Sequence, residues 1–140
     1  MKLYRYMTES ELNAFNLNDL TNVGSVFDKT TGHKYANTHC YEEGVKYLHF
    51  FKNKSDIKFM RSMYKEVEKE FYICEFDVPV LTALKYRGKG IYDMGGYDTD
   101  RVYATEYAIP VFKLKPEYLV AHKFDNQHYL QQRSKDNIKE

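Results

Sequence analysis

The sequence contains no tryptophan and only two cysteines, Cys40 and Cys74, which lie far apart and form no C-x-x-C motif. Two isolated cysteines cannot build the disulfide framework of a small secreted domain, so we expect reduced thiols. No signal peptide precedes the first apolar segment, and no apolar run approaches the roughly 20 residues that cross a bilayer. These absences predict a soluble cytoplasmic protein with no membrane partner.

A charge excess of one sign is also missing. The 21 basic and 20 acidic residues leave a net charge of +1, which does not demand a nucleic-acid partner, although a local patch can hide in a balanced total. The five histidines include no H-x-x-x-H pair, so no metal site is predicted. The sequence contains no P-loop, no complete Rossmann fingerprint and no Gly-x-Ser-x-Gly elbow. It therefore lacks the common motifs for binding nucleotides and for serine-dependent hydrolysis.

Aromatic residues are abundant, with 14 tyrosines and 9 phenylalanines among 140 residues. The tyrosines suit either a core with polar tips or the wall of a ligand groove, and both explanations stay open. The length and a hydrophobic fraction of 43% fit a single domain with its own core. We expect this domain to cover residues 1–126 and a polar C-terminal tail to cover residues 127–140.

Hydrophobic pattern and turn residues predict a succession of strands and helices. Thr8 and Glu11 form a Thr-x-x-Glu capping box that starts a short helix, and Asp56 begins a longer amphipathic helix. The expected strands cover residues 2–7, 23–28, 45–51, 71–77, 102–112 and 118–124. We interpret residues 80–86 as an extension or a second strand, and the glycine-rich residues 87–100 as a flexible loop beside a ligand. This order indicates an α+β domain.

Several polar side chains stand out inside otherwise apolar, aromatic strands. Arg5 is costly to bury unless it pairs with an anion, and its planar fork suits a phosphate. Tyr47 and His49 alternate along their strand and therefore share one face. Glu106 is the single carboxylate of its strand, and it either faces water or lines a cleft. Each also has a structural explanation, as a surface ion pair, a core side chain or a group on a solvated sheet face.

The segment EYAIP at residues 106–110 resembles the glutamate strand of ADP-ribosyltransferase-like proteins. An arginine strand, a capped helix, an aromatic strand and a late glutamate strand also follow one another in an order similar to that family. The resemblance implies an α+β fold with a split, mostly antiparallel sheet and flanking helices. It also implies a transferase that uses NAD.

The resemblance further implies roles for individual residues, with Glu106, Arg5 and His49 as the catalytic set. Arg5 would hold the phosphates or a ribose of NAD. Tyr47 or His49 would contact the nicotinamide ribose, and Glu106 would stabilise the oxocarbenium-like centre. Two tyrosines of the glycine-rich loop, Tyr92 and Tyr97, would close over the bound ligand.

The chain departs from the family at two points. Ala104 stands where arginine-specific members carry a second glutamate, and the middle strand has no Ser-Thr-Ser motif. The resemblance therefore points to a divergent small bacterial or phage member whose macromolecular acceptor, a protein or a nucleic acid, is unidentified. Two alternatives stay open. One is a catalytically inactive binding module of the same fold that blocks a host partner, and the other is a nucleic-acid-binding protein whose tyrosines stack on bases.

Overall fold

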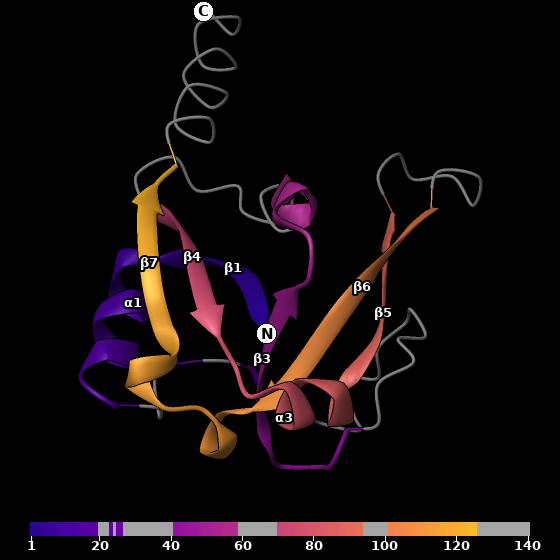
Figure 1. Ribbon diagram of the computed structural model, residues 1–140, viewed down its shortest axis with the longest axis horizontal. Coiled ribbons are helices and arrows are strands. Elements are labelled where there is room, and N and C mark those ends of the chain that lie inside the picture. Colours follow the sequence, from indigo (N-terminus) through magenta and orange to yellow (C-terminus); the bar gives the residue numbers. More distant parts are fainter. Residues whose placement is uncertain (20–22, 24, 27–40, 59–69, 94–100, 126–140) are drawn as a thin grey trace, which may run out of the picture.

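The computed structural model describes residues 1–19, 23, 25–26, 41–58, 70–93 and 101–125, which form a mixed α/β protein built on an antiparallel sheet (Figure 1). In chain order its main elements are β1 (Lys2–Thr8), α1 (Glu9–Asn16), β2 (Ser25–Val26), β3 (Lys46–Phe51), β4 (Phe71–Asp77), α3 (Val80–Lys85), β5 (Arg87–Asp93), β6 (Arg101–Pro110) and β7 (Leu119–Phe124). The 3-10 turns are η2 (Lys54–Asp56), η4 (Val111–Lys113) and η5 (Pro116–Tyr118). The predicted α+β class is confirmed at this level.

The first strand, β1, lies inside the sheet rather than at its edge. The strand order is β5–β6–β3–β1–β4–β7, each neighbouring pair is antiparallel, and the short β2 pairs with β3 outside this order. In Figure 1, β3, β6 and β5 form one side of the sheet, while β1, β4 and β7 form the other. The chain therefore crosses between the two sides several times.

The two sides of the sheet meet at a narrow seam between β1 and β3. β1 is in register with β4 along all of Lys2–Thr8, whereas β1 and β3 share only the pair Tyr4↔Phe51. Backbone groups of β1 and β3 away from this pair need partners outside a shared ladder. Side chains near the seam can therefore donate hydrogen bonds to, or accept them from, the backbone groups that the strand pairing leaves over.

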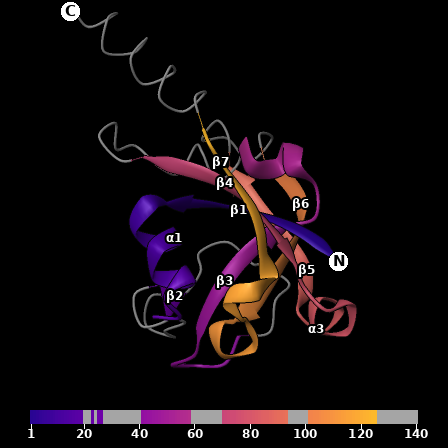
Figure 2. The same ribbon diagram turned by 60° about the vertical axis from the view of Figure 1, so that its left-hand side comes forward.

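The turn from β1 into α1 is encoded locally. Thr8 is the N-cap, and its Oγ1 accepts a hydrogen bond from the Glu11 backbone N–H at 3.2 Å, while the Glu11 carboxylate accepts one from the Thr8 backbone N–H at 3.4 Å. Leu12 and Phe15 lie one turn apart and are buried against the sheet. The predicted capping box is confirmed, and Figure 2 shows α1 on one side of the sheet, away from α3.

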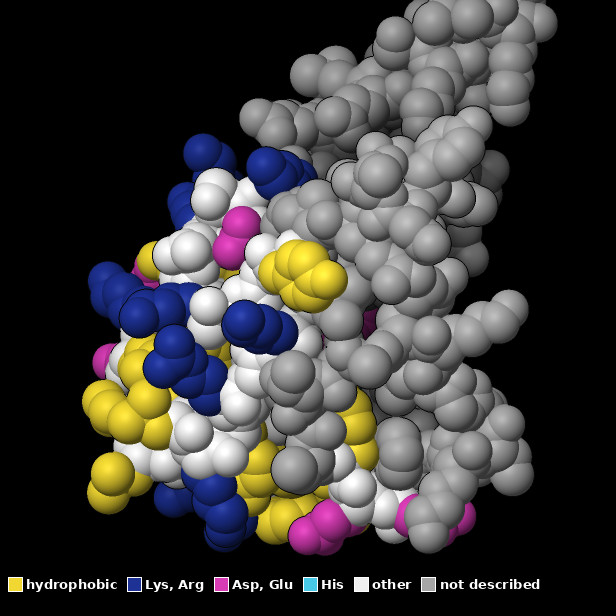
Figure 3. All heavy atoms as spheres, turned by 90° about the vertical axis from the view of Figure 1, so that its right-hand side faces the viewer, with side chains coloured by type: hydrophobic (Ala, Val, Ile, Leu, Met, Phe, Trp, Pro, Cys, Tyr) yellow, Lys and Arg dark blue, Asp and Glu magenta, His cyan; other side chains and the backbone are white. Residues whose placement is uncertain are grey.

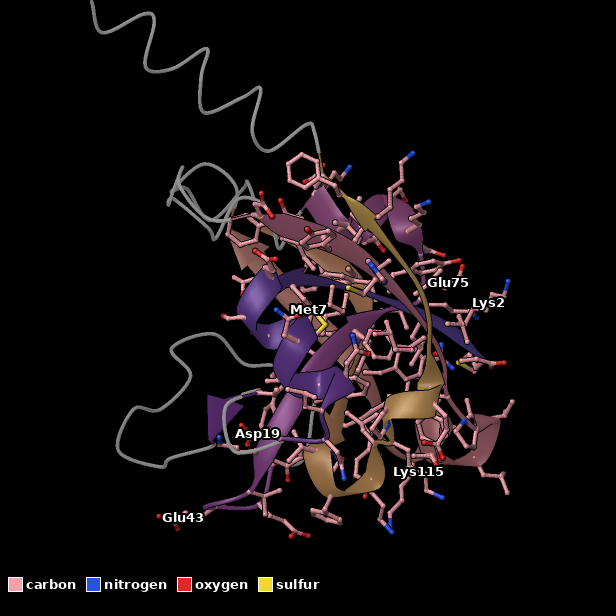
Figure 4. All side chains as sticks on the ribbon, turned by 90° about the vertical axis from the view of Figure 1, so that its left-hand side faces the viewer. Lys2, Met7, Asp19, Glu43, Glu75 and Lys115 are labelled. Atoms are coloured by element: carbon pink, nitrogen blue, oxygen red, sulfur yellow. The ribbon has the colours of Figure 1, made fainter. Side chains whose placement is uncertain are left out.

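Alternating side chains divide the strands into two apolar faces. The face on which α1 packs, here named the α1 face, carries the larger core cluster, which includes Leu3, Met7, Leu12, Phe15, Leu48, Phe50, Cys74, Phe76, Tyr107 and Ile109. Figure 4 shows Met7 of this cluster close to α1. The other face, named the Glu106 face, carries the smaller cluster of Tyr6, Phe51, Ile57, Phe71 and Ala104.

The expectation of a strand or an extension over residues 80–86 was wrong, because Val80–Lys85 forms the helix α3. Pro79 stands at its N-cap, and the Ala83 backbone N–H donates to the Pro79 carbonyl at 3.0 Å. Leucine, alanine and lysine are good helix formers, and a proline at the start of a helix lacks only a donor that the helix does not use. Local propensity therefore overrides the short apolar pattern.

The expectation of a glycine-rich loop over residues 87–100 was wrong for its first half. Arg87–Asp93 forms β5, which pairs with β6 from Arg87↔Tyr107 to Asp93↔Arg101. Glycine disfavours strands, but the aromatic and β-branched residues of β6 supply a strong partner. Residues 94–100 lie outside the described residues.

The remaining expected elements are confirmed in part. β6 ends at Pro110, and η4 follows where a strand was expected to continue to residue 112. Within the expected strand over residues 23–28 the structure describes β2 and the buried Val23, which lies outside a strand. The long helix beyond residue 58 and the C-terminal tail lie outside the described residues. No helix in the described part of the chain combines the length and hydrophobicity needed to span a bilayer.

Candidate functional site

Glu106 is a carboxylate held inside the sheet. It lies on β6 directly opposite Phe51 of β3, and Phe51 lies opposite Tyr4 of β1, so the three side chains share one face. The residue is 3% exposed. A carboxylate is costly to bury even when it is paired, so this placement calls for an explanation beyond packing.

His49 stands beside this carboxylate. Its Nε2 lies 3.8 Å from Glu106 Oε1 and 2.8 Å from the hydroxyl oxygen of Tyr41. The register places His49 opposite Ala108, so the imidazole reaches Glu106 diagonally across the β3–β6 pair. The His49 side chain is 26% exposed. Solvent therefore reaches this group of residues through the imidazole rather than through the carboxylate.

Two tyrosines complete the Glu106 cluster, which consists of Tyr41, Tyr47, His49 and Glu106. The rings of Tyr41 and Tyr47 meet edge to face with their centroids 5.1 Å apart, a favoured arrangement of aromatic rings. The hydroxyl oxygen of the buried Tyr47 accepts a hydrogen bond from the Glu42 backbone N–H at 2.8 Å. Tyr47 therefore anchors the segment that carries Tyr41, and the partly exposed Tyr41 is the ring better placed to meet a ligand.

Arg5 lies on the α1 face, because it alternates with Tyr4 along β1. Its Nη2 lies 3.0 Å from Glu11 Oε2, and its Nη1 donates a hydrogen bond to the backbone carbonyl of His49 at 3.1 Å. The side chain is buried, and its Nε makes no hydrogen bond within the described residues. The guanidinium thus fastens α1 to β3 across the seam.

The structure brings together three of the predicted site residues, Tyr47, His49 and Glu106, on one face of the sheet. The guanidinium of Arg5 is on the opposite face and contacts this group through the main chain of His49. The phosphate-binding role of Arg5 stays a prediction, and its described contacts favour a structural role.

The structure does not describe the side chains of the two tyrosines expected to close over the ligand. Tyr92 belongs to β5, where its backbone pairs with Val102, so it is part of a strand and not of a loop. The side chain of Tyr92 and the whole of Tyr97 lie outside the described residues. Their role as a cover for the ligand stays a prediction.

The edge of the Glu106 face at β5 is lined by glycine. Gly88 lies opposite Glu106, and Gly90 lies opposite Ala104. Glycine inside a strand often marks a place where a ligand or another backbone approaches closely. In the strand register Glu106 therefore lies between a glycine, Gly88 of β5, and an aromatic residue, Phe51 of β3.

Tyr41 was not identified from the sequence. Glu11 was identified as part of the capping box but not as the ion-pair partner of Arg5. Tyr41 follows a polar segment without periodicity, and no sequence signal links it to His49. Glu11 binds the Thr8 backbone N–H with Oε1 and the Arg5 guanidinium with Oε2. An acidic residue in the first turn after an arginine-bearing buried strand is the signal that could have identified this second contact.

The Glu106 cluster places a negative charge beside a group that carries protons. A carboxylate in a poorly solvated site stabilises a developing positive charge more strongly than one in water. Imidazole accepts or donates a proton near neutral pH. Within the described residues, no group of three or more His, Cys, Asp or Glu side chains is placed to hold a metal ion. The cluster suits a reaction that develops a cation and moves a proton.

No family model matches this sequence, and neither a curated protein nor a solved structure was found to be significantly similar to it. The geometry of the Glu106 cluster is thus the basis for assigning a function.

Proposed function

We propose that the protein is a divergent ADP-ribosyltransferase-like protein that uses NAD and transfers ADP-ribose to a macromolecular acceptor. The observation that carries this proposal is the buried carboxylate of Glu106 beside His49. It lies on a strand that resembles the glutamate strand of that family. An antiparallel sheet with α1 packed on one face is compatible with the fold that the resemblance implies.

In this reaction the glycosidic bond between nicotinamide and C1′ of the ribose breaks, and the bonding electron pair leaves with the nicotinamide nitrogen, which becomes neutral. The ribose carbon gains oxocarbenium character, and the carboxylate of Glu106 stabilises this positive charge. A nucleophile of the acceptor then forms a bond to C1′ and gives up its proton. His49, with its exposed edge, is the group that takes up this proton.

The described residues fit the reacting end of NAD better than its diphosphate. Tyr41 presents a partly exposed ring and a hydroxyl beside His49, which suits stacking on nicotinamide or a hydrogen bond to the ribose. Arg5, the predicted diphosphate ligand, is not on this face. The proposal therefore gives Arg5 a positioning role, in which it holds the His49 carbonyl and with it the strand that carries the imidazole.

The test is nicotinamide release from NAD by the purified protein, with Glu106→Gln compared with Glu75→Gln. Glu75 is a matched control because Tyr4 pairs with Phe51 on one side and with Glu75 on the other, so both glutamates belong to one row of side chains. At the surface, Lys2 Nζ lies 3.9 Å from Glu75 Oε2 (Figure 4). We expect Glu106→Gln to lower the rate about a hundredfold or more, and Glu75→Gln to lower it less than about twofold.

Equal rates for the wild type and Glu106→Gln would refute the catalytic role of this carboxylate. Equal losses in both glutamine variants would show that the sheet tolerates neither change, and the role of Glu106 would again be rejected. The free energy of unfolding of each variant, measured alongside, separates loss of chemistry from loss of fold.

A second candidate is a catalytically inactive binding module of the same fold. The observation that favours it is the engagement of Arg5, whose guanidinium is held by Glu11 and by the main chain of His49. Such a module would release no nicotinamide at any protein concentration, with or without added protein or nucleic acid as acceptor. Calorimetric titration with NAD would then give no heat of binding, whereas a transferase would bind NAD.

A further inference from the structure

The β5–β6 hairpin carries basic and aromatic side chains on the face that does not bear Glu106. Arg87 and Lys89 alternate along β5 and are exposed, and Tyr103 of β6 is 61% exposed. The register places Gly88 opposite Glu106, so Arg87, Lys89 and Tyr103 share the opposite face. Two basic side chains and one aromatic ring therefore point away from the Glu106 cluster.

A third basic residue, Lys85, is exposed in the last turn of α3, directly before the hairpin. We name Lys85, Arg87, Lys89 and Tyr103 the hairpin surface. Residues 85–90 contain no acidic residue. Figure 3 shows lysine and arginine side chains gathered on the described part of the side of the molecule that carries β5. Lys85, Arg87 and Lys89 thus bring three basic side chains to the hairpin surface, while Asp93 follows at the end of β5 and the whole chain has a net charge of +1.

Tyr103 does not belong to the hydrophobic core, so packing does not account for an aromatic side chain at this position. On its face of β6 the apolar cluster ends at Tyr107, which is 1% exposed, and the strand continues to Tyr103 in solvent. An exposed ring offers an apolar surface on which an unpaired nucleic-acid base can stack, whatever its sequence. A paired base in a duplex would keep its faces covered by its neighbours, so the ring suits a single strand.

The spacing of the two strand cations fits a nucleic-acid backbone. Alternate residues of a strand lie about 6.8 Å apart, twice the rise of about 3.4 Å per residue. Consecutive phosphates of one strand are separated by a similar distance, because the phosphates lie off the helix axis and the sugar between two of them spans more than the axial rise of about 3.4 Å per nucleotide. Arg87 and Lys89 can therefore contact two consecutive phosphates of one strand.

We infer that the hairpin surface binds single-stranded nucleic acid, with Arg87 and Lys89 on the phosphates and Tyr103 stacked on a base. This inference goes beyond the proposed function, because it involves the opposite face and none of the residues of the Glu106 cluster. Glu106→Gln is therefore expected to bind as the wild type does, so failure of the one proposal is distinguishable from failure of the other.

The test is fluorescence anisotropy with labelled oligouridylate and oligothymidylate of about ten nucleotides, which covers a typical single-strand site. The variant Arg87→Glu/Lys89→Glu is compared with Lys113→Glu/Lys115→Glu, which changes the net charge equally at exposed lysines near η4. We expect the hairpin variant to weaken binding about tenfold or more. The plot of log affinity against log salt should become less steep by about 1.4, which is about 0.7 for each of two lost phosphate contacts. The control variant should keep the wild-type slope.

Stacking is tested separately with Tyr103→Ala against Phe112→Ala, since Phe112 is also an exposed aromatic residue, at 65%. We expect Tyr103→Ala to weaken binding about fivefold or more without changing the salt dependence, and Phe112→Ala to have no effect. A preference for one oligonucleotide would identify RNA or DNA as the partner. Absence of binding to both at low salt, equal losses in both charge variants, or binding to phosphatidylserine vesicles alone would overturn the inference.

Discussion

Two pairs of a carboxylate and a cationic or protonatable group lie on opposite faces of the same sheet. Arg5 and Glu11 are 3.0 Å apart on the α1 face, and the guanidinium also donates to a backbone carbonyl. His49 and Glu106 are 3.8 Å apart on the other face, and the imidazole is also within hydrogen-bond distance of Tyr41. The first pair is permanently charged, whereas the charge of the second depends on the protonation of an imidazole.

The difference separates a structural ion pair from a site that can do chemistry. When an arginine that bridges a helix and a strand through several hydrogen bonds is removed, the folded protein becomes less stable, because the buried partner carboxylate is left without a counter-charge. A buried carboxylate carries a desolvation cost, and the partly exposed imidazole beside Glu106 supplies a counter-charge only while it is protonated. The comparison therefore predicts that removing the charge of Arg5 lowers the free energy of unfolding, whereas removing the charge of Glu106 leaves it unchanged or raises it.

The largest effect is expected for Arg5→Met. The variant leaves Glu11 without its cation and the His49 carbonyl without its donor, so the free energy of unfolding should fall by about 3 kcal/mol. Denaturant titration monitored by circular dichroism measures this change. Adding Glu11→Gln to the same chain should recover part of the loss. A single variant as stable as the wild type would show that the pair on the α1 face does not stabilise the fold.

Cys74, the cross-strand partner of Arg5, provides a test of how strongly the α1 face excludes water, through the dependence of stability on pH. Burial raises the pKa of its thiol from 9.0 to about 12, against an opposing effect of Arg5 and with a smaller contribution from Glu11. The unfolded chain releases this proton more easily, so the stabilisation is complete below about pH 9 and is lost as the pH rises toward about 12. The loss should approach, at most, about 1.4 kcal/mol per pH unit in that range. Cys74→Ala should lack this part of the alkaline slope, and equal slopes would contradict a buried thiol.

The smallest effect on stability is expected for Glu106→Gln. Glutamine has the same shape and removes a charge from a poorly solvated position, so the free energy of unfolding should stay unchanged or rise by up to about 1 kcal/mol. Thermal and denaturant unfolding of the variant and of Glu75→Gln measure it. A decrease of several kcal/mol would place Glu106 with Arg5 among the structural charges and would end the contrast between the two faces.

Local signals in the sequence predicted much of this fold. The capping box of Thr8 and Glu11, and the alternating apolar residues of β3 and β4, depend on neighbours in the chain. The helix α3 and the strand β5 were misjudged for two different reasons. Residues 80–85 are too few for a clear helical period, and glycines at 88 and 90 suggested a loop until pairing with β6 made them a strand. A partner strand supplies hydrogen bonds that no local pattern records.

The sequence by itself determined the identity of the unusual side chains and the face on which neighbours such as Tyr47 and His49 lie, because alternation along a strand is a local property. Only the tertiary structure decided that Arg5 and Glu106 lie on opposite faces and that Tyr41 meets His49. Those relations depend on the single registered pair between β1 and β3 and on the hydrogen bonds of Tyr41 and Glu42 with residues of β3. Register between distant strands is set by the packing of the whole sheet, and a shift of one residue would exchange the two faces.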